Sequence, residues 1–351
     1  MADPSFRVGF RGRPMHQAFL DVVGRAPTLD VGTLNVPDEE LASVLADTHG
    51  YYVSSARNEL PLPFHVTSDL IAKMPSLILA VAYGAGYDTV DVDACTRAGI
   101  AVVNQAGGNA EGVAEHALGM MLSLLKRMPE THIAMKAGGI REREAFMGRE
   151  IAGRTVGIIG LGHVGSRTAT YLKAFGCRVL AYDPYLDEDT CAARGAKKTE
   201  LDALLEQSDV VSVHCPLNSE TEGMLGAREY ALMPEGAILV NTARGGIPQE
   251  GALFDALESG HLAGAGLDAW AVEPPPEDHP LLSHPRVIGT VHTGGVTHES
   301  RARVAEMAGE AFVAAAAGEL PPRIVNPEVI PAYIERWTKT FGRPFPGAAA
   351  R

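Results

Sequence analysis

The sequence lacks several features that would mark particular classes of protein. It has four cysteines in 351 residues, and no pair shows the C-x-x-C spacing of zinc sites or redox motifs. Basic residues are outnumbered, with 30 Lys and Arg against 43 Asp and Glu, so the formal net charge is −13. Such a charge argues against a nucleic-acid backbone or an anionic membrane as the main partner. We therefore expect no metal site, no nucleic acid and no membrane, and an anionic substrate would need a local positive group.

Long apolar runs are missing as well. No uninterrupted apolar stretch reaches membrane-spanning length, and the N-terminus shows no basic segment followed by an apolar one. A reducing cytoplasm is the simplest compartment for a chain with so few cysteines. The residues that are present, 46% apolar and 21% charged, are typical of a globular protein, and a length of 351 residues suggests two domains.

One glycine-rich stretch is the most informative part of the chain. An apolar run predicts a strand that stops at Gly160, and Gly162 and Gly165 then open a helical pattern. This is the layout of a dinucleotide-binding turn. Gly160 permits the tight turn, Gly162 lets the backbone approach a pyrophosphate, and Gly165 allows close packing of helix on strand. The phosphates would lie at the helix N-terminus, although a glycine-rich turn alone can be only a tight connection.

An acidic residue at the expected distance strengthens this interpretation. Asp183 stands at the end of the next apolar run, where it would accept hydrogen bonds from the adenosine ribose. Its charge would repel a 2′-phosphate and no arginine follows it directly, so NAD is favoured over NADP as the cofactor. The alternative is that Asp183 only starts a turn before Pro184.

Apolar strands alternate with helical segments along most of the chain. After Asp183 the pattern predicts strands at 209–216, 237–242, 262–268 and 286–291, and before the glycine turn at 6–10, 50–53, 77–81 and 100–103. Alternation of this kind implies parallel sheets that are covered on both faces. We therefore predict an α/β protein with two Rossmann-like, doubly wound parallel-sheet domains, of which the larger binds NAD.

Three connecting segments set the expected domain boundaries. Residues 113–128 place apolar side chains on a broad helical face, either as a hinge and interface helix or as a core helix of one domain. Residues 136–150 have few core residues, which suggests an arm that packs on another subunit. The proline-rich end from residue 318 has too few apolar residues for its own domain. The prediction is a substrate domain at 1–111, an NAD-binding domain at 112–297, and a return to the substrate domain with a C-terminal tail at 298–351.

Three polar residues follow strands of the predicted cofactor sheet, at the edge where open α/β sheets bind ligands: Arg244, Glu273 and His292. They suit hydride transfer between a nicotinamide ring and a carbon that bears oxygen. His292 would protonate the oxygen, Glu273 would hold the other ring nitrogen and favour the protonated form, and Arg244 would bind a carboxylate and polarise the carbonyl. Each residue alone is often structural or solvated, but the set together with the glycine turn favours a dehydrogenase.

With these motifs, the chain resembles the D-2-hydroxyacid dehydrogenase family, whose NAD-dependent members use an Arg–Glu–His set. The matching stretches are residues 83–91, 109–116, 160–165, 241–246, 266–268 with 273–274, and 292, within a resemblance that covers about residues 45–327. The resemblance implies an enzyme that interconverts a D-2-hydroxy acid and its 2-keto acid. It also implies a homodimer formed through the long helix and the arm.

The family resemblance implies further contacts. It places the backbone N–H groups of His163 and Val164 at the pyrophosphate, and the backbone of Tyr83 and Gly84 at the substrate carboxylate. Asp268 resembles the residue that meets the nicotinamide carboxamide. The remaining residues that the resemblance places around the cofactor are Cys215, Pro216, Thr242, Ala243 and Gly294.

The substrate side chain is less defined. Phosphoglycerate-type members carry an arginine near Ala82 and phosphite-type members a lysine at Ala85, and this chain has neither, which leaves an ordinary 2-keto or 2-hydroxy acid. The strand end at 51–57 is unusual for the family, and we hypothesise that it contacts the substrate side chain. The residues concerned are Tyr52, Ser54 and Arg57, together with Tyr83. The tyrosines could instead pack inside the small domain.

A second function is compatible with the same residues. It is an NAD(H)-sensing, corepressor-like binding protein on the same fold, with little turnover. Relatives of that kind can retain Arg244, Glu273 and His292. NAD-dependent association with partner peptides would distinguish it from the dehydrogenase, which oxidises NADH with a 2-keto acid.

Overall fold

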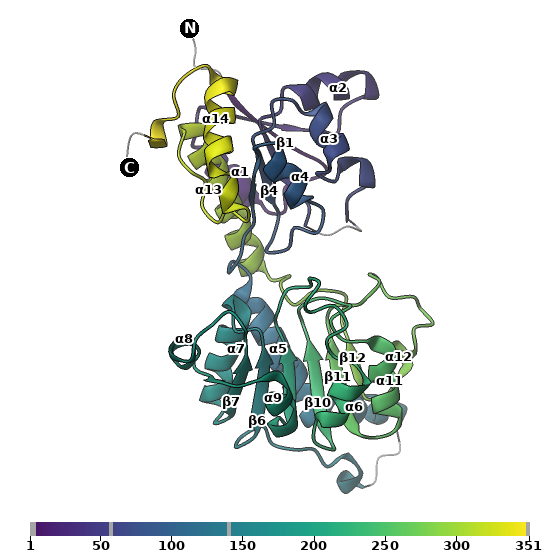
Figure 1. Cartoon of the computed structure of the whole chain (residues 1–351). Helices are drawn as coiled ribbons and strands as arrows, with labels where there is room; N and C mark the ends of the chain where they lie inside the picture. Colours follow the sequence, from purple (N-terminus) through teal and green to yellow (C-terminus); the bar gives the residue numbers. More distant parts are fainter. Residues whose placement is uncertain (1–4, 56–58, 139–141, 349–351) are drawn as a thin grey trace. The chain divides into compact units, whose positions relative to one another are not determined.

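The computed structural model describes residues 5–55, 59–138 and 142–348. The chain divides into two compact units, one formed by Met1–Asn109 with His298–Arg351 and the other by Ala110–Thr297. Both units are α/β, and their helices and strands are labelled in Figure 1.

The first unit is built on a parallel sheet of five strands in the order β2-β1-β3-β4-β5. The strands are β1 (Phe6–Phe10), β2 (Leu29–Thr33), β3 (Gly50–Val53), β4 (Leu79–Ala82) and β5 (Ala101–Val103). The helices are α1 (Gln17–Val23), α2 (Asp38–Ala46), α3 (Ser68–Lys73), α4 (Val92–Arg97), α13 (His298–Ala317) and α14 (Ile330–Phe341). The central strands β3 and β4 are buried at every residue, as expected for a parallel sheet with both faces covered.

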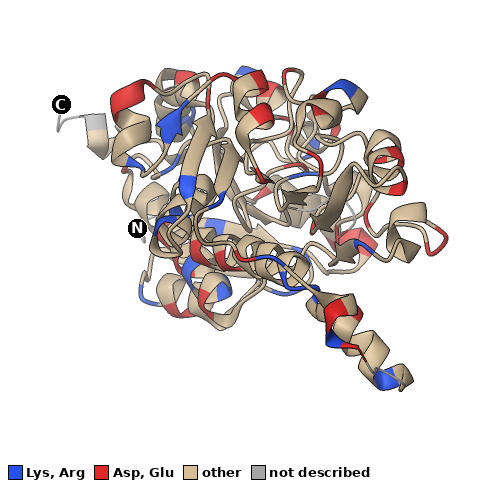
Figure 2. Ribbon diagram, turned by 90° about the horizontal axis from the view of Figure 1, so that it is seen from below, with Lys and Arg blue, Asp and Glu red and all other residues tan. Residues whose placement is uncertain are grey.

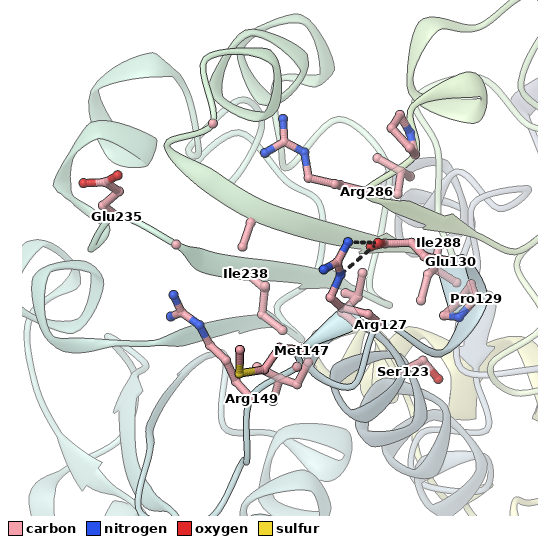
Figure 3. A pocket seen from close by; sticks show the side chains of 18 residues that line it. Ser123, Arg127, Pro129, Glu130, Met147, Arg149, Glu235, Ile238, Arg286 and Ile288 are labelled. Atoms are coloured by element: carbon pink, nitrogen blue, oxygen red, sulfur yellow. Dashed lines mark hydrogen bonds and ion pairs between the residues drawn. The ribbon is translucent and has the colours of Figure 1, made fainter. Parts of the chain in front are cut away.

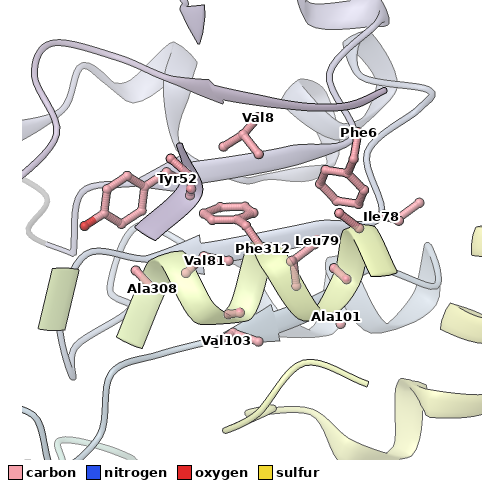
Figure 4. Packing of buried hydrophobic residues seen from close by; sticks show 14 of the residues in the cluster. Phe6, Val8, Tyr52, Ile78, Leu79, Val81, Ala101, Val103, Ala308 and Phe312 are labelled. Atoms are coloured by element: carbon pink, nitrogen blue, oxygen red, sulfur yellow. The ribbon is translucent and has the colours of Figure 1, made fainter. Parts of the chain in front are cut away.

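Two apolar layers cover this sheet. On one face α1, α13 and α14 pack on the strands, and Phe312 of α13 lies among the strand side chains with Phe6 to one side and Tyr52 to the other (Figure 4). Gly50 leaves the room for this packing, because a Cβ there would lie 2.7 Å from the Phe312 ring. Helices α2, α3 and α4 cover the opposite face, around Tyr51. Residues near both ends of the chain therefore share one core.

The second unit has a parallel sheet of seven strands in the order β12-β11-β10-β9-β6-β7-β8. The strands are β6 (Thr155–Ile159), β7 (Arg178–Tyr182), β8 (Lys197–Lys198), β9 (Val210–Val213), β10 (Ala237–Asn241), β11 (Leu262–Leu267) and β12 (Val287–Gly289). The chain runs outward from β6 to β8 and then returns to β9 on the other side of β6. This reversal makes the carboxyl ends of β6 and β9 a switch point, where open α/β sheets bind ligands.

Helices cover both faces of the second sheet. Core residues from α5 (Ala110–Leu125), α7 (His163–Ala174) and α8 (Glu188–Ala193) pack on one face. The opposite face carries α9 (Leu201–Gln207), α10 (Ala227–Leu232), α11 (Glu250–Glu258) and α12 (Pro280–Ser283). After α5 the chain forms α6 (Met128–Ala137), which contributes no buried residue.

The predicted fold class, two doubly wound parallel-sheet units, is confirmed. Several elements differ from the sequence prediction, among them β2, β8 and α6, which were not expected, and the helix predicted over 113–128, which begins at Ala110 and ends at Leu125. Acidic and basic residues are interspersed along the helices, as Figure 2 shows. Among the described residues, no helix combines the length and the apolar character that crossing a membrane requires.

Candidate active site

The turn after β6 is closed by glycines. Gly160 has a backbone φ of +89°, and a Cβ there would lie 2.6 Å from the backbone nitrogen of Cys215. At Gly165 a Cβ would lie 2.1 Å from the carbonyl oxygen of Gly160, whereas a Cβ at Gly162 would point into open space. Helix α7 begins directly afterwards at His163, and the N–H groups of a first helical turn have no acceptor within the helix. The turn therefore leaves an open approach to amide groups that suit a phosphate.

Asp183 lies directly after β7 and contacts the glycine turn. Its Oδ2 accepts the N–H of Leu161 at 3.0 Å, and its Oδ1 accepts the N–H of Tyr185 at 3.1 Å. Asp183 thus starts the turn before Pro184 and also bonds the glycine turn, and its contact with a ribose stays a prediction. Sequence analysis did not single out Arg194, which donates to the carbonyl oxygen of Leu161 at 2.6 Å.

The end of β9 carries a histidine that sequence analysis missed. His214 Nε2 lies 2.9 Å from Ser212 Oγ, and its Nδ1 lies 3.5 Å from Thr242 Oγ1. Burial lowers the pKa of His214 to about 4, and burial raises the pKa of the adjacent Cys215 thiol to about 11. Both side chains are therefore neutral near pH 7, while Pro216 is exposed. The position of His214 at a strand end was the signal that could have identified it.

A buried asparagine positions Arg244. Asn241, the last residue of β10, accepts the N–H of Ala243 at 3.1 Å and donates its own Nδ2–H to the carbonyl oxygen of Arg244 at 2.9 Å. These bonds close a tight turn in which Ala243 is buried and Arg244 is partly exposed. At Gly245 a Cβ would lie 1.9 Å from the carbonyl group of Trp270. The backbone of this turn therefore rests directly on the segment that leads to Glu273.

Glu273 and His292 form a close pair. His292 Nδ1 lies 3.0 Å from Glu273 Oε1 and 2.9 Å from Oε2, and Oε1 also accepts the N–H of Trp270 at 3.1 Å. Because a carboxylate only accepts hydrogen bonds, Nδ1 of His292 carries a hydrogen. Nε2 then remains for a reacting group.

The charges of these residues act on one another. The hydrogen bond with Glu273 raises the pKa of His292 against the opposing effect of burial, and the positive charge of Arg244 also opposes it. Burial would raise the pKa of Glu273, but the bond with His292 and the charges of His292 and Arg244 hold that pKa below its ordinary value. The structure thus brings Arg244, Glu273 and His292 into one electrostatic group in which the imidazole is biased toward its protonated form.

Asp268 lies directly after β11, is buried, and binds the loop that carries His292. Its Oδ1 accepts the Thr290 hydroxyl at 2.6 Å and the Thr293 N–H at 2.7 Å, and its Oδ2 accepts the Gly294 N–H at 2.8 Å. Its backbone carbonyl accepts the N–H of His292 at 2.8 Å. Asp268 and Gly294, both expected at the cofactor, therefore bond each other, and their contact with a cofactor stays a prediction.

In the first unit, Tyr83 and Gly84 follow the end of β4. The Tyr83 hydroxyl donates to the carbonyl oxygens of Arg11 and Arg13 at 3.3 Å each, and the Gly84 N–H donates to Ser55 Oγ at 2.7 Å. The loop expected to receive a substrate carboxylate is thus tied to the ends of β1 and β3. Ser55 was not among the expected residues, although it belongs to the unusual strand end that sequence analysis noted.

The other expected substrate residues of this unit have different surroundings. Tyr52 is 0% exposed, and its ring centroid lies 4.4 Å from that of Phe19 and 4.1 Å from that of Tyr83. Core packing, the alternative interpretation, therefore accounts for Tyr52, because the ring has no surface to offer a substrate. Ser54 is also buried and donates to Glu59 Oε2 at 2.5 Å. Arg57 lies outside the described residues.

A cavity of about 710 Å³ opens elsewhere in the second unit (Figure 3). Its lining includes Glu235 and Gly236 before β10, Gly260 before β11, and Arg286 before β12. These residues precede the strands, so the cavity lies at the amino edge of the sheet and not at the edge that carries Arg244 and its neighbours. Figure 3 shows the ion pair between Arg127 and Glu130 at its wall, with 2.5 Å between Nη2 and Oε2.

Known proteins with similar sequences and structures were also identified. Residues 118–294 match the sequence model of a family described as D-isomer specific 2-hydroxyacid dehydrogenase, NAD binding domain. A D-3-phosphoglycerate dehydrogenase of Bacillus subtilis is 37% identical over 297 residues, which is 84% of this chain and 55% of the relative. The chain thus spans about half the length of that relative.

Two further proteins are similar over most of their own length. A glyoxylate reductase of Korarchaeum cryptofilum is 38% identical over 268 residues, covering 76% of this chain and 81% of the relative. The crystal structure of a D-lactate dehydrogenase from Aquifex aeolicus, complexed with NAD and lactic acid, superimposes with a TM-score of 0.76 at 30% identity, covering 89% of this chain and 96% of that one.

Proposed function

Because the chain belongs to the D-isomer specific 2-hydroxyacid dehydrogenase family and has its NAD-binding domain at residues 118–294, we propose that it is an NAD-dependent oxidoreductase. It interconverts a D-2-hydroxy acid and the corresponding 2-oxo acid. The observation that carries this proposal is the His292–Glu273 pair, with the charge of Arg244 acting on both members, at the ligand-binding edge of the NAD-binding sheet.

His292 acts as the acid and base of the reaction. When bound, NADH would supply the hydride for the carbonyl carbon of the 2-oxo acid. His292 would donate the proton on Nε2 to the carbonyl oxygen in reduction, and neutral His292 would accept the hydroxyl proton in oxidation. Glu273 keeps Nδ1 protonated and raises the pKa of His292. The ring therefore keeps its second proton to a higher pH than an ordinary histidine does.

Arg244 binds the substrate. Its guanidinium group has the planar geometry that pairs with a carboxylate, and it also stabilises negative charge that develops on the carbonyl oxygen. The turn held by Asn241 and Gly245 fixes the guanidinium's point of attachment. We separately propose that the first unit is the substrate domain and that its loop at Tyr83 and Gly84 contacts substrate through groups other than the N–H groups of these two residues, which donate within the unit.

The cofactor is held by the carboxyl edge of the second sheet. His163, Val164 and the glycines of the turn approach the pyrophosphate, and Asp183 binds the adenosine ribose, since each of its oxygens has a further lone pair beyond its backbone hydrogen bond. The remaining cofactor contacts in this proposal come from Asp268, the buried carboxylate described above, and from five further residues: Cys215, Pro216, Thr242, Ala243 and Gly294.

A substrate panel tests the function directly. We would follow NADH absorbance with glyoxylate, hydroxypyruvate, pyruvate, phenylpyruvate and 2-oxoglutarate, and include 3-phosphohydroxypyruvate because of the phosphoglycerate dehydrogenase relative. Turnover of at least one acid is expected, with the D isomer as product. The relatives named above carry enzyme names, so they do not support the binding-protein alternative. Tight NADH binding without turnover of any acid would contradict the dehydrogenase and favour that alternative.

We also propose that the protein is a homodimer. Large apolar side chains are unusually exposed in α6 and the segment after it, with Met128 at 57%, Ile133 at 66%, Met135 at 69% and Met147 at 73%. Exposed large apolar side chains concentrated on one segment support an interaction surface there. Light scattering should give twice the chain mass for the wild type and the chain mass for Ile133→Glu. Leu62→Glu, at a similarly exposed site of the first unit, is the control that should stay dimeric.

A cytoplasmic location completes the proposal. The four cysteines are unpaired in the structure, and such thiols persist in a reducing compartment. Fractionation of the source cells should place the protein with cytoplasmic enzymes.

A further inference from the structure

A second polar group, formed by His116, Thr290 and Asp268, adjoins the loop that carries His292, and neither His116 nor Thr290 has a role in the chemistry proposed above. His116 of α5 places its Nε2 3.0 Å from Thr290 Oγ1 and 3.6 Å from Asp268 Oδ1. Asp268 in turn accepts hydrogen bonds from the loop that carries His292. The side chain of Asp268 is 2% exposed and that of His116 24%, so the group is largely shielded from water.

The chemistry of the three groups fixes the direction of their hydrogen bonds. A carboxylate only accepts, so the 2.6 Å contact between Thr290 Oγ1 and Asp268 Oδ1 uses the single hydroxyl proton of Thr290. Thr290 Oγ1 must then accept from His116, which requires a hydrogen on Nε2. His116 therefore donates to Thr290, and Thr290 donates to Asp268.

The loop at the end of this relay has an unusual backbone. His292 has a φ of +55°, a left-handed conformation that non-glycine residues adopt rarely. Asp268 binds both sides of it, through the N–H of His292 and the N–H of Thr293. At Gly294 a Cβ would lie 2.8 Å from Asp268 Oδ2 and 3.5 Å from Cγ of His116. The path of the loop is therefore shaped by Asp268 and His116 together.

We propose that His116 is a positioning residue for the acid/base histidine. By donating through Thr290, it fixes the orientation of the Asp268 carboxylate, and Asp268 holds the left-handed backbone that directs His292 at Glu273. This inference rests on the proposed function only where it assigns proton transfer to His292. The orientation of the His292 ring is a property of the fold and is measurable without turnover.

The test replaces His116 and follows His292. In His116→Ala, NMR titration of the His292 ring should give a lower pKa than in the wild type, because the bond to Glu273 that raises it is loosened while the charges of Arg244, Glu273 and Asp268 remain. In the reductive direction kcat should fall about ten- to a hundredfold, as expected for a misplaced catalytic group, with little change in the KM for NADH. His116→Gln, whose side-chain amide can donate in place of Nε2, should restore most of the pKa and of the turnover rate.

Two further variants separate positioning from general damage. Thr290→Val removes the relay but keeps the shape of the side chain, so its effect on the His292 pKa should match that of His116→Ala and should not add to it in the double variant. His261→Gln alters another partly buried histidine of the same unit, bonded to the carbonyl of Tyr230 at 2.9 Å, and should leave His292 unchanged.

The outcomes that overturn the inference are distinct from those that overturn the function. A wild-type His292 pKa in both His116→Ala and Thr290→Val, or additive effects of the two, would refute the relay. If the wild-type protein reduces no 2-oxo acid, the proposed function fails, and the NMR titration still decides the role of His116.

Discussion

The bonds around Asp268 and Glu273, at the carboxyl edge of one sheet, differ in kind from those around Tyr83 and Gly84, at the carboxyl edge of the other. In the seven-stranded sheet the bonds involve charged groups: Glu273 pairs with His292, and Asp268 accepts three hydrogen bonds through its carboxylate. At the end of β4 in the five-stranded sheet the bonds join neutral groups, the Tyr83 hydroxyl with two backbone carbonyls and the Gly84 N–H with Ser55. In the proposed function the first edge supplies the group that transfers a proton, whereas the bonds at the second hold a loop.

This contrast shows how similar sheets come to serve different tasks. In the first unit the apolar core extends to the end of β3, where the Tyr52 ring is stacked on Phe19 and packs at a tilt against Tyr83. In the second unit the strands end in Asn241 and in the segment that begins with Asp268, both buried polar residues whose hydrogen bonds hold turns. Buried polar groups that are fully bonded give rigid geometry, which a reacting set requires and a core does not.

The largest effect is expected when the charged edge, the carboxyl edge of the seven-stranded sheet, loses His292, the proposed acid. His292→Ala should lower kcat by about 10²- to 10⁴-fold, the usual contribution of a general acid, while NADH affinity is retained. Stopped-flow kinetics and NADH fluorescence titration measure the two quantities. Activity equal to the wild type would show that another group delivers the proton.

A smaller loss is expected when the acid keeps its place but loses its partner. Glu273→Gln removes the interaction that raises the pKa of His292, so the ring releases its proton at a lower pH. Reduction needs the protonated ring and falls as pH rises through this pKa, so its alkaline limb should move to lower pH, and kcat near neutral pH should drop roughly ten- to a hundredfold, the value of a hydrogen bond to a charged group. A pH profile that does not move would remove Glu273 from this role.

The cofactor end of the charged edge can be tested separately. Asp183→Ala should weaken NAD binding by about tenfold or more, because hydrogen bonds from the ribose to a carboxylate are lost, and should narrow the preference for NAD over NADP. Isothermal titration with both cofactors gives the ratio. Asp189→Ala, on the exposed first turn of α8, serves as the control with unchanged affinities.

The neutral edge should respond least, and in stability more than in activity. Tyr83→Phe deletes the hydroxyl that bonds the carbonyls of Arg11 and Arg13 and should cost about 1 kcal/mol of unfolding free energy. Tyr52→Phe deletes a buried hydroxyl that has no hydrogen-bond partner and should leave stability equal or slightly higher. Urea denaturation of the two variants compares them, and equal losses would show that the two hydroxyls are not different in kind.

Sequence predicted most strands because buried parallel strands are continuous apolar runs. It missed β2, an edge strand in which Asp30 and Gly32 interrupt the apolar pattern. It also missed α6, where Pro129 looks like a helix breaker but occupies the first turn, in which proline is tolerated. Arg127, with a φ of 53°, separates α5 from α6, so the first helix ends at Leu125 and not at Met128 as predicted.

The sequence predicted those residues of the candidate site whose side chains have a chemical role of their own in the proposal. Arg244, Glu273 and His292 stand at strand ends, which the apolar pattern locates. The supporting residues were not predictable, because their function lies in bonds between distant positions: His116 and Thr290 are 174 residues apart in the chain. Asn241 and Ser55 act through backbone hydrogen bonds that no composition or spacing reveals.

The absence of a side chain at Gly245 affects the positions of both Arg244 and Glu273. With only hydrogen at its α-carbon, the chain after Arg244 can lie flat on the peptide between Trp270 and Ala271, two residues before Glu273. Any larger substituent would clash with this peptide and displace the turn of Arg244 from the segment that leads to Glu273. Variation at this position would therefore disturb Arg244 and Glu273 together, although the residue itself contributes no functional group.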